Sequence, residues 1–372
     1  MENFNHINRF ILRAPFQTVN HFSEIPSDET QVALFVKELF HDEVFKEAIF
    51  LASPDLYYEW SRMVVDADMP KIKQDKIIAS IVKYYIRSAT RCTPFGLFSG
   101  YTEIQHKQYK DSQILNPLER FSGIDLQFLY TLIYKLNHNK EIRNCVQFSI
   151  NSSMYKVGSF YRYAEFKIQQ NKRAYSLIEV EADQVLELIF NVVKKEAQSF
   201  KELTELLMYA IEDISEEEVV IYLHSLIDSQ ILISDLDINI NGISPLDQIV
   251  NYFESNIIDF TESTSVLNYY KLLNDLKDKL SQLDQNVVGN SISQYDEIFK
   301  TAKAFQINFD KKYLINTNLR TNVPQEEYDL TSTEMSNIKK AIYALSRFSV
   351  KNENSNFHYT GMLPFNGKYI RR

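Results

Sequence analysis

The stretch KYYIRSATRCTPFGLFSG (Lys83–Gly100) places three cationic side chains at the end of a predicted helix. Lys83, Arg87 and Arg91 are spaced i, i+4 and i+8, so they form one ridge if the helix continues through all three. Like charges at this spacing repel one another by a few tenths of a kcal/mol per pair. A bound phosphate or carboxylate relieves that repulsion, because arginine binds both anions bidentately. The ridge therefore indicates an anion site or, as a charge run alone favours, a solvated basic face.

The helix that carries this ridge is predicted over residues 71–91, where a proline and a glycine follow as its stop. Upstream, Phe10–Ala14 is short and apolar, which is typical of a strand. Residues 29–51 have apolar side chains at helical spacing and predict one helix. Pro54 interrupts it, because the residue before a proline avoids the α region.

Bulk composition is that of an ordinary globular protein, since 45% of the 372 residues are hydrophobic and 24% are charged. The formal net charge of −9 argues against a general nucleic-acid coat, although it leaves room for a local basic site. We find no secretory signal and no apolar run of about 18 residues, so no membrane span is predicted. Two cysteines are too few for a zinc site and indicate a reducing compartment, so we expect a cytoplasmic protein without a metal.

Residues 155–233 follow the order strand, strand, three helices, strand. The two strands flank a polar turn at residues 169–172, and Asp183 is positioned to cap the first helix. The other two helices begin with capping boxes, in which a serine and a glutamate bond each other's backbone. This order predicts a small winged helix-turn-helix unit. The boxes are Ser199 with Glu202 and Ser215 with Glu218.

The whole chain is predicted to be α+β, with several mixed subdomains around this winged helix-turn-helix unit. Gly242 and Pro245 mark the boundary that follows the unit. A last helix is predicted over Met335–Phe348, and the tail that follows is polar and irregular. The predicted segments are 1–150, 151–240, 241–350 and 351–372.

Arg87–Phe98 resembles the signature of the lantibiotic dehydratase family, which modifies ribosomally made peptides (RiPPs). FILRAPF (Phe10–Phe16) places Arg13 before a proline, as that family does near its start. AIFLASPDLY (Ala48–Tyr57) resembles the family's next marker. GIDLQFL (Gly123–Leu129) resembles an aspartate-containing helix start, although the family often has arginine where Gly123 stands here. The resemblance extends over about residues 5–350 and is weaker toward the end.

The resemblance implies that this chain is the front part of a glutamylation domain. In that family, the domain transfers glutamate from glutamyl-tRNA to Ser or Thr hydroxyls of a precursor peptide. A separate elimination domain then leaves dehydroalanine or dehydrobutyrine. Glutamyl-tRNA is thus the expected co-substrate, and no bound cofactor is expected. By resemblance, the residues that match glutamylation positions are Arg13, Lys83, Arg87, Thr90 and Arg91.

Cationic residues suit this reaction because the tRNA brings phosphates, the glutamyl group brings a carboxylate, and ester attack develops an oxyanion. The sequence does not single out a general base among its seven histidines, which are scattered along the chain.

The winged-helix pattern matches in layout the RiPP recognition element of this family, which holds the leader of the precursor peptide as an added strand. The alternative for each apolar candidate is a place in the unit's own core. DNA is not an expected ligand, because the third helix begins with three glutamates that would repel phosphate. The peptide-binding candidates are Tyr163, Phe166 and Ile168 on the strand, and Val220, Leu223 and Ile227 on the third helix.

Members of this family are far longer than 372 residues, so we expect a truncated enzyme, one piece of a split enzyme or a degenerate copy. The partner chain expected by resemblance carries the rest of the glutamylation domain, the elimination domain, or both. Two other functions stay open: a non-catalytic subunit that binds the leader peptide, and a relative of the peptide–aminoacyl-tRNA ligases.

Overall fold

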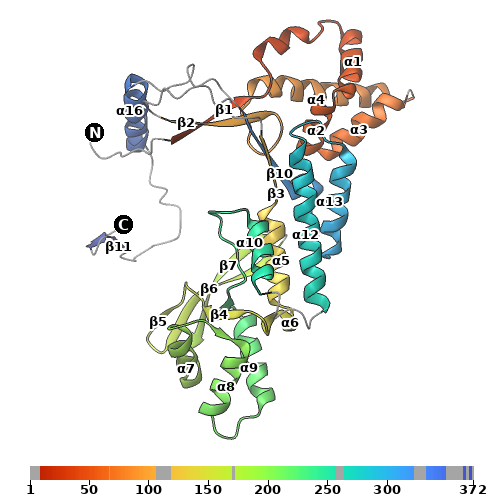
Figure 1. Cartoon of the computed structure of the whole chain (residues 1–372). Coiled ribbons are helices and arrows are strands. Elements are labelled where there is room, and N and C mark those ends of the chain that lie inside the picture. The colour runs from red at the N-terminus through yellow and green to blue at the C-terminus, as the bar shows by residue number, and fades with distance from the viewer. Residues whose placement is uncertain are drawn as a thin grey trace. The chain divides into compact units, whose positions relative to one another are not determined.

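The computed structural model describes most of the chain, and its helices and strands are grouped rather than regularly alternating (Figure 1). The predicted α+β class is therefore confirmed. No helix in the described ranges is both long and apolar enough to cross a membrane. The described residues are 9–66, 68–105, 119–169, 172–256, 264–321, 332–348, 363–365 and 368–370.

Two compact units make up the chain. The larger contains Arg13–Tyr101 and Asn116–Asn322, and the smaller contains Met1–Leu12, Thr102–Leu115 and Val323–Arg372. The larger unit thus takes in most of three predicted segments, and their status as subdomains stays a prediction.

A four-stranded sheet has the order β1-β2-β10-β3, with β10 parallel to β2 and antiparallel to β3. Leu319 of β10 pairs with Gly100 of β2. A Cβ atom at Gly100 would collide with the Thr321 side chain, so the strands approach this closely only with glycine there. The strands are β1 (Arg9–Pro15), β2 (Ser99–Gln105), β3 (Glu119–Ile124) and β10 (Ile315–Arg320).

Four helices, α1 (Glu29–Glu38), α2 (Glu43–Ala52), α3 (Pro54–Val65) and α4 (Lys71–Thr90), form the N-terminal part of the larger unit. The single helix predicted over residues 29–51 is wrong, because the chain breaks it between α1 and α2. The Asp42 side chain accepts hydrogen bonds from Val44 N and Phe45 N and so starts a new helix. Trp60 is fully buried among these helices, and its Nε1 donates to Val36 O at 3.1 Å.

The buried residues around Trp60 form one hydrophobic core. A separate hydrophobic core packs four further helices against the middle of the chain. Asp125 caps the first of these helices, where the sequence predicts an aspartate at a helix start. Figure 1 shows the long helices α12 and α13 running together. The helices are α5 (Leu126–Asn137), α10 (Pro245–Ser255), α12 (Thr264–Gln285) and α13 (Ile292–Ala304).

The middle of the chain has the predicted order of elements, and both capping boxes are present. The first predicted strand is in fact two, because Gly158 turns the chain with a φ of 63°. The designation as a winged helix-turn-helix stays a prediction. The elements are β4 (Gln147–Ile150), β5 (Tyr155–Val157), β6 (Phe160–Gln169), β7 (Lys172–Glu181), α7 (Gln184–Val193), α8 (Phe200–Ala210), α9 (Glu216–Asp228) and β9 (Leu232–Ser234).

The tail is not irregular throughout, because two short strands there, β11 (Leu363–Phe365) and β12 (Lys368–Ile370), pair antiparallel. The predicted last helix is present as α16 (Ser332–Phe348). The remaining short elements are η1 (Val19–Glu24), η2 (Leu39–His41), α6 (Lys140–Arg143), β8 (Gln198–Ser199) and α14 (Lys311–Leu314).

Candidate functional site

The cationic end of α4 is only partly a helical ridge. Lys83 and Arg87 lie on its last two turns, but the helix ends at Thr90. Arg91 is the C-cap residue with extended angles, φ −130° and ψ 130°, so its side chain leaves the helical spacing. The predicted ridge of three is therefore a ridge of two followed by a third cation on an extended residue.

Arg87 is the best-held member of this group. It is half-buried, its Nη2 donates to Thr93 Oγ1 at 3.3 Å, and its guanidinium lies 6.0 Å from the Tyr84 ring centroid. Its Nε is buried and has no hydrogen-bond partner within the described part of the chain. An unsatisfied buried donor on a charged group is unfavourable unless something else accepts from it.

Lys83 and Arg91 are exposed, and so is Thr90 between Arg87 and Arg91. Thr90 donates its hydroxyl to Ile86 O at 2.8 Å, so its oxygen is left as an acceptor. Among the described residues, Lys83, Arg87 and Arg91 make no ion pair with a carboxylate. The negative end of the α4 dipole stabilises cations on its last turn and does not itself attract anions, so anion binding would rest on the side chains.

Arg13 comes from a distant segment that the fold brings to the same end of α4. It is half-buried on β1, with its guanidinium 5.7 Å from the Tyr101 ring centroid. Just beyond it, Gln17 N donates to Ser88 O at 3.2 Å and Phe16 N donates to Phe98 O at 2.9 Å. These bonds fasten the end of β1 to the signature stretch.

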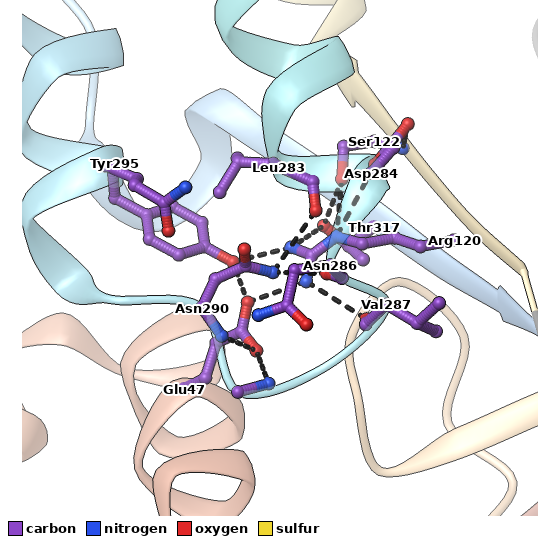
Figure 2. Close-up of polar contacts among 12 residues, drawn as sticks. Glu47, Arg120, Ser122, Leu283, Asp284, Asn286, Val287, Asn290, Tyr295 and Thr317 are labelled. Atoms are coloured by element: carbon purple, nitrogen blue, oxygen red, sulfur yellow. Dashed lines mark hydrogen bonds and ion pairs between the residues drawn. The ribbon is translucent and has the colours of Figure 1, made fainter.

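A second polar cluster was not predicted, and it is buried (Figure 2). Arg120 on β3 lies between Glu47 of α2 and Tyr295 of α13, and all three side chains are buried. Its Nη1 is 2.6 Å from Glu47 Oε1, and its Nη2 donates to the Tyr295 hydroxyl at 2.6 Å. The hydroxyl in turn donates to Glu47 Oε1 at 2.5 Å. Burial raises the pKa of Tyr295 well above its ordinary value, which keeps the phenol neutral and able to donate.

The second oxygen of Glu47 is also satisfied. Glu47 Oε2 accepts from Gly289 N at 2.7 Å and from Asn290 N at 3.0 Å. Asp284 lies beside the cluster, where it accepts from Ser122 N at 3.0 Å, and burial raises the pKa of its carboxyl. Both carboxylate oxygens of Glu47 thus accept hydrogen bonds within the protein. The cluster therefore stabilises the packing of α2, β3 and α13 and does not have the character of a ligand site.

Three of the six peptide-binding candidates lie in the core. Tyr163 is 1% exposed, Leu223 is 0% exposed and Ile227 is 7% exposed, so none of them has surface to offer a peptide. The core alternative is correct for these three. Phe166, Ile168 and Val220 are half-buried.

The strand expected to receive the leader, β6, is central in its sheet, whose order is β5-β6-β7. Beyond the short pairing with β5, side chains occupy its other edge. Ala164 N donates to Ser153 Oγ at 2.9 Å, and Phe166 N donates to Gln230 Oε1 at 3.1 Å. Gln230 Nε2 also donates to Phe166 O at 2.6 Å. Strand addition to β6 is therefore blocked at these residues.

The edge strands of this sheet are β5 and β7, and β7 is the longer of the two. It pairs with β6 along its length and has no second neighbour among the described strands. Tyr175 and Leu177 on β7 are 63% and 65% exposed, and they lie across from Phe166 and Ala164 on one face of the sheet. Unpaired edge strands with apolar side chains are surfaces to which another strand can add.

The family model described as "Lantibiotic dehydratase, N terminus" matches residues 41–360. The epidermin biosynthesis protein EpiB of Staphylococcus epidermidis is 25% identical over 91% of this chain and 32% of its own length. The nisin biosynthesis protein NisB of Lactococcus lactis is 24% identical over 77% of this chain and 29% of its own length. The chain thus spans about a third of the length of these relatives.

Solved structures share the fold. The tRNA-dependent lantibiotic dehydratase MibB of Microbispora superposes with a TM-score of 0.70 at 16% identity, over 92% of this chain and 31% of MibB. The glutamylation domain TbtB of thiomuracin biosynthesis, bound to 5'-phosphodesmethylglutamycin, gives a TM-score of 0.61 at 14% identity, over 85% of this chain and 37% of that chain.

Proposed function

Because this chain belongs to the lantibiotic dehydratase N-terminal family, we propose that it takes part in transferring glutamate from glutamyl-tRNA to Ser or Thr side chains of a precursor peptide. The observation that carries the proposal is the group at the end of α4. Lys83, Arg87 and Arg91 lie there without carboxylate partners among the described residues, and Arg87 keeps a buried, unsatisfied Nε. A phosphate or a carboxylate supplies the acceptor that such a group lacks.

The proposed reaction exchanges one ester for another. The Ser or Thr hydroxyl oxygen attacks the carbonyl carbon of the glutamyl ester, and the bond from that carbon to the ribose oxygen breaks. The hydroxyl proton ends on the ribose oxygen, so no other reactant is needed. Negative charge develops on the carbonyl oxygen during attack, where a fixed guanidinium stabilises it.

We assign roles within the group by exposure. Lys83 and Arg91 are exposed and suit phosphates, which stay partly in water. Arg87 and Arg13 are half-buried and held by aromatic rings, so they suit the glutamyl carboxylate or the developing oxyanion, where a fixed position matters most.

The leader of the precursor peptide is proposed to add as a strand to β7 rather than to β6. Backbone hydrogen bonds would supply affinity, and Tyr175 and Leu177 would contact alternate leader side chains. The remaining two thirds of the relatives' length have no counterpart in these 372 residues. We propose that glutamate elimination and the rest of the glutamylation site belong to that part, as further segments or as a partner chain.

A second candidate function is a leader-binding subunit without catalysis, which the exposed β7 edge favours on its own. One assay separates the two. The chain is mixed with its partner chain, precursor peptide, glutamate, tRNA and the glutamyl-tRNA synthetase. The mass of the precursor peptide is then measured by mass spectrometry.

Glutamylation predicts a mass gain of one or more glutamyl groups that Arg87→Ala abolishes while leader binding is retained. The matched control is Lys76→Ala, an exposed cation earlier on α4, which should leave the gain intact. If the wild type binds the leader peptide but the precursor gains no mass, that result would contradict catalysis. It would favour a leader-binding subunit without catalysis.

A further inference from the structure

Phe95 occupies an unfavourable backbone conformation at the surface. Its φ is 62°, in the left-handed region that glycine favours, and its ring is 66% exposed. A bulky aromatic residue there is a genuine outlier. Such strain persists only where the surrounding structure imposes it, and it is concentrated at functional sites.

The loop around Phe95 is fixed at both ends. Thr93 O accepts from Ser99 Oγ at 2.5 Å, and Thr93 Oγ1 accepts from Arg87 at 3.3 Å. Leu97 and Phe98, which follow directly, are 1% and 6% exposed. The next two apolar residues are thus committed to the core while the Phe95 ring is held outside it.

Exposed cations precede this ring in the chain. Arg91 is exposed four residues before it, and Lys83 is exposed on the helix that leads into the loop. An aromatic ring beside unpaired cations is the combination that binds single-stranded nucleic acid, where rings stack on bases and cations hold phosphates. A scattered exposed phenylalanine needs no explanation by itself, but one held in a strained conformation four residues after an exposed arginine does.

We propose that Phe95 stacks on a base in the single-stranded 3′ end of the aminoacyl-tRNA, while Lys83 and Arg91 hold the adjoining phosphates. Stacking is tolerant of base identity, so Phe95 positions the acceptor end and does not read its sequence. This inference rests on the proposed use of aminoacyl-tRNA. It adds a positioning residue that neither charge nor hydrogen bonding identifies.

The test uses an RNA minihelix with a single-stranded 3′ end, in which 2-aminopurine replaces the terminal adenosine. Stacking on the protein changes the fluorescence of this base. The wild type is expected to bind and to change the fluorescence. Phe95→Ala should lose that change and weaken binding by roughly five- to 150-fold, the range for losing one stacked ring. Phe95→Trp should restore both, because any flat ring can stack.

Two controls keep the outcome interpretable. Tyr209→Ala removes a ring that is 93% exposed on α8 and should change nothing. Phe95→Ala should melt close to the wild type, because the residue is 66% exposed and alanine keeps the Cβ atom and hence the same backbone strain. Phe95→Ala could bind the minihelix with the affinity and the fluorescence change of the wild type, while binding still depends on Lys83. That result would overturn the stacking role of Phe95 but not the binding of phosphates. Absence of wild-type binding would instead count against the tRNA part of the proposed function. Loss of precursor binding rather than RNA binding in Phe95→Ala would assign the ring to the peptide and also overturn the inference.

Discussion

At the scale of single residues, Glu47 and Arg120 should affect stability most sharply. Both are buried, and removing one partner leaves an uncompensated buried charge. We expect Arg120→Met to lower the free energy of unfolding by about 3–5 kcal/mol. Glu47→Gln combined with Arg120→Met should lose less than the sum of the two single variants, because neither charge then stays unpaired. Urea unfolding measures all three, and additive losses would contradict a coupled pair.

His224 gives the larger unit a sensitivity to acid. Burial, followed by the charges of Arg143 and Lys140, lowers the pKa of His224, while Asp228 acts in the opposite direction. Arg143 Nη1 lies 3.1 Å from His224 Nδ1, and since arginine only donates, the ring accepts and is neutral. A lowered pKa means that the unfolded chain binds the proton first, so stability falls as the pH drops below about 6.5.

The corresponding experiment compares urea unfolding at neutral and mildly acidic pH. His224→Gln should reduce the loss of stability over that range. The same loss in His224→Gln as in the wild type would show that other groups carry it.

Residue-scale prediction from sequence succeeded where the interaction is local. Each capping box spans four residues, and both formed as predicted. The Glu47–Arg120–Tyr295 cluster joins residues 73 and 175 positions apart, which no local pattern encodes. One signal was present: Glu47 lies on the apolar side of its helix between Phe45, Ala48 and Ile49, where a charge needs a buried partner.

At the scale of elements, β7 is the proposed site for the leader, and Leu177 tests it. The side chain is 65% exposed, so Leu177→Asp should leave the fold unchanged. It should weaken binding of a labelled leader peptide by roughly tenfold or more, as expected for losing about 1.4 kcal/mol or more of apolar contact. Met208→Asp, on an α8 residue that is 40% exposed, serves as the control. Equal leader affinity in both variants and the wild type would rule out this face of β7.

Element boundaries were harder to predict than element types. Periodicity identified α4 and α9, but it ran α1 and α2 together because apolar spacing continues across Asp42. Periodicity also does not show which strand of a sheet lies at the edge, and the choice between β6 and β7 for the leader stays a prediction. Three peptide-binding candidates on β6 and α9 are core residues instead. Apolar side chains at periodic positions are usually buried in the nearest core.

At the scale of the whole molecule, the chain brings together segments that are distant in sequence. Residues near 13–17 meet the end of α4 through Gln17–Ser88 and Phe16–Phe98 hydrogen bonds, which the signature itself does not reveal. Family resemblance, rather than spacing, placed Arg13 in the group. We propose that the exposed cations of this group, Lys83 and Arg91, bind the phosphates of aminoacyl-tRNA.

The most direct test measures the dissociation constant for an acceptor-stem minihelix over a series of salt concentrations. Each lost phosphate contact reduces the slope of log affinity against log salt by about 0.7–0.9. We predict that Lys83→Ala and Arg91→Ala each lower the slope by about that amount, whereas Lys76→Ala, on the same helix, leaves it unchanged. Equal slopes in the wild type and all three variants would contradict phosphate binding by Lys83 and Arg91.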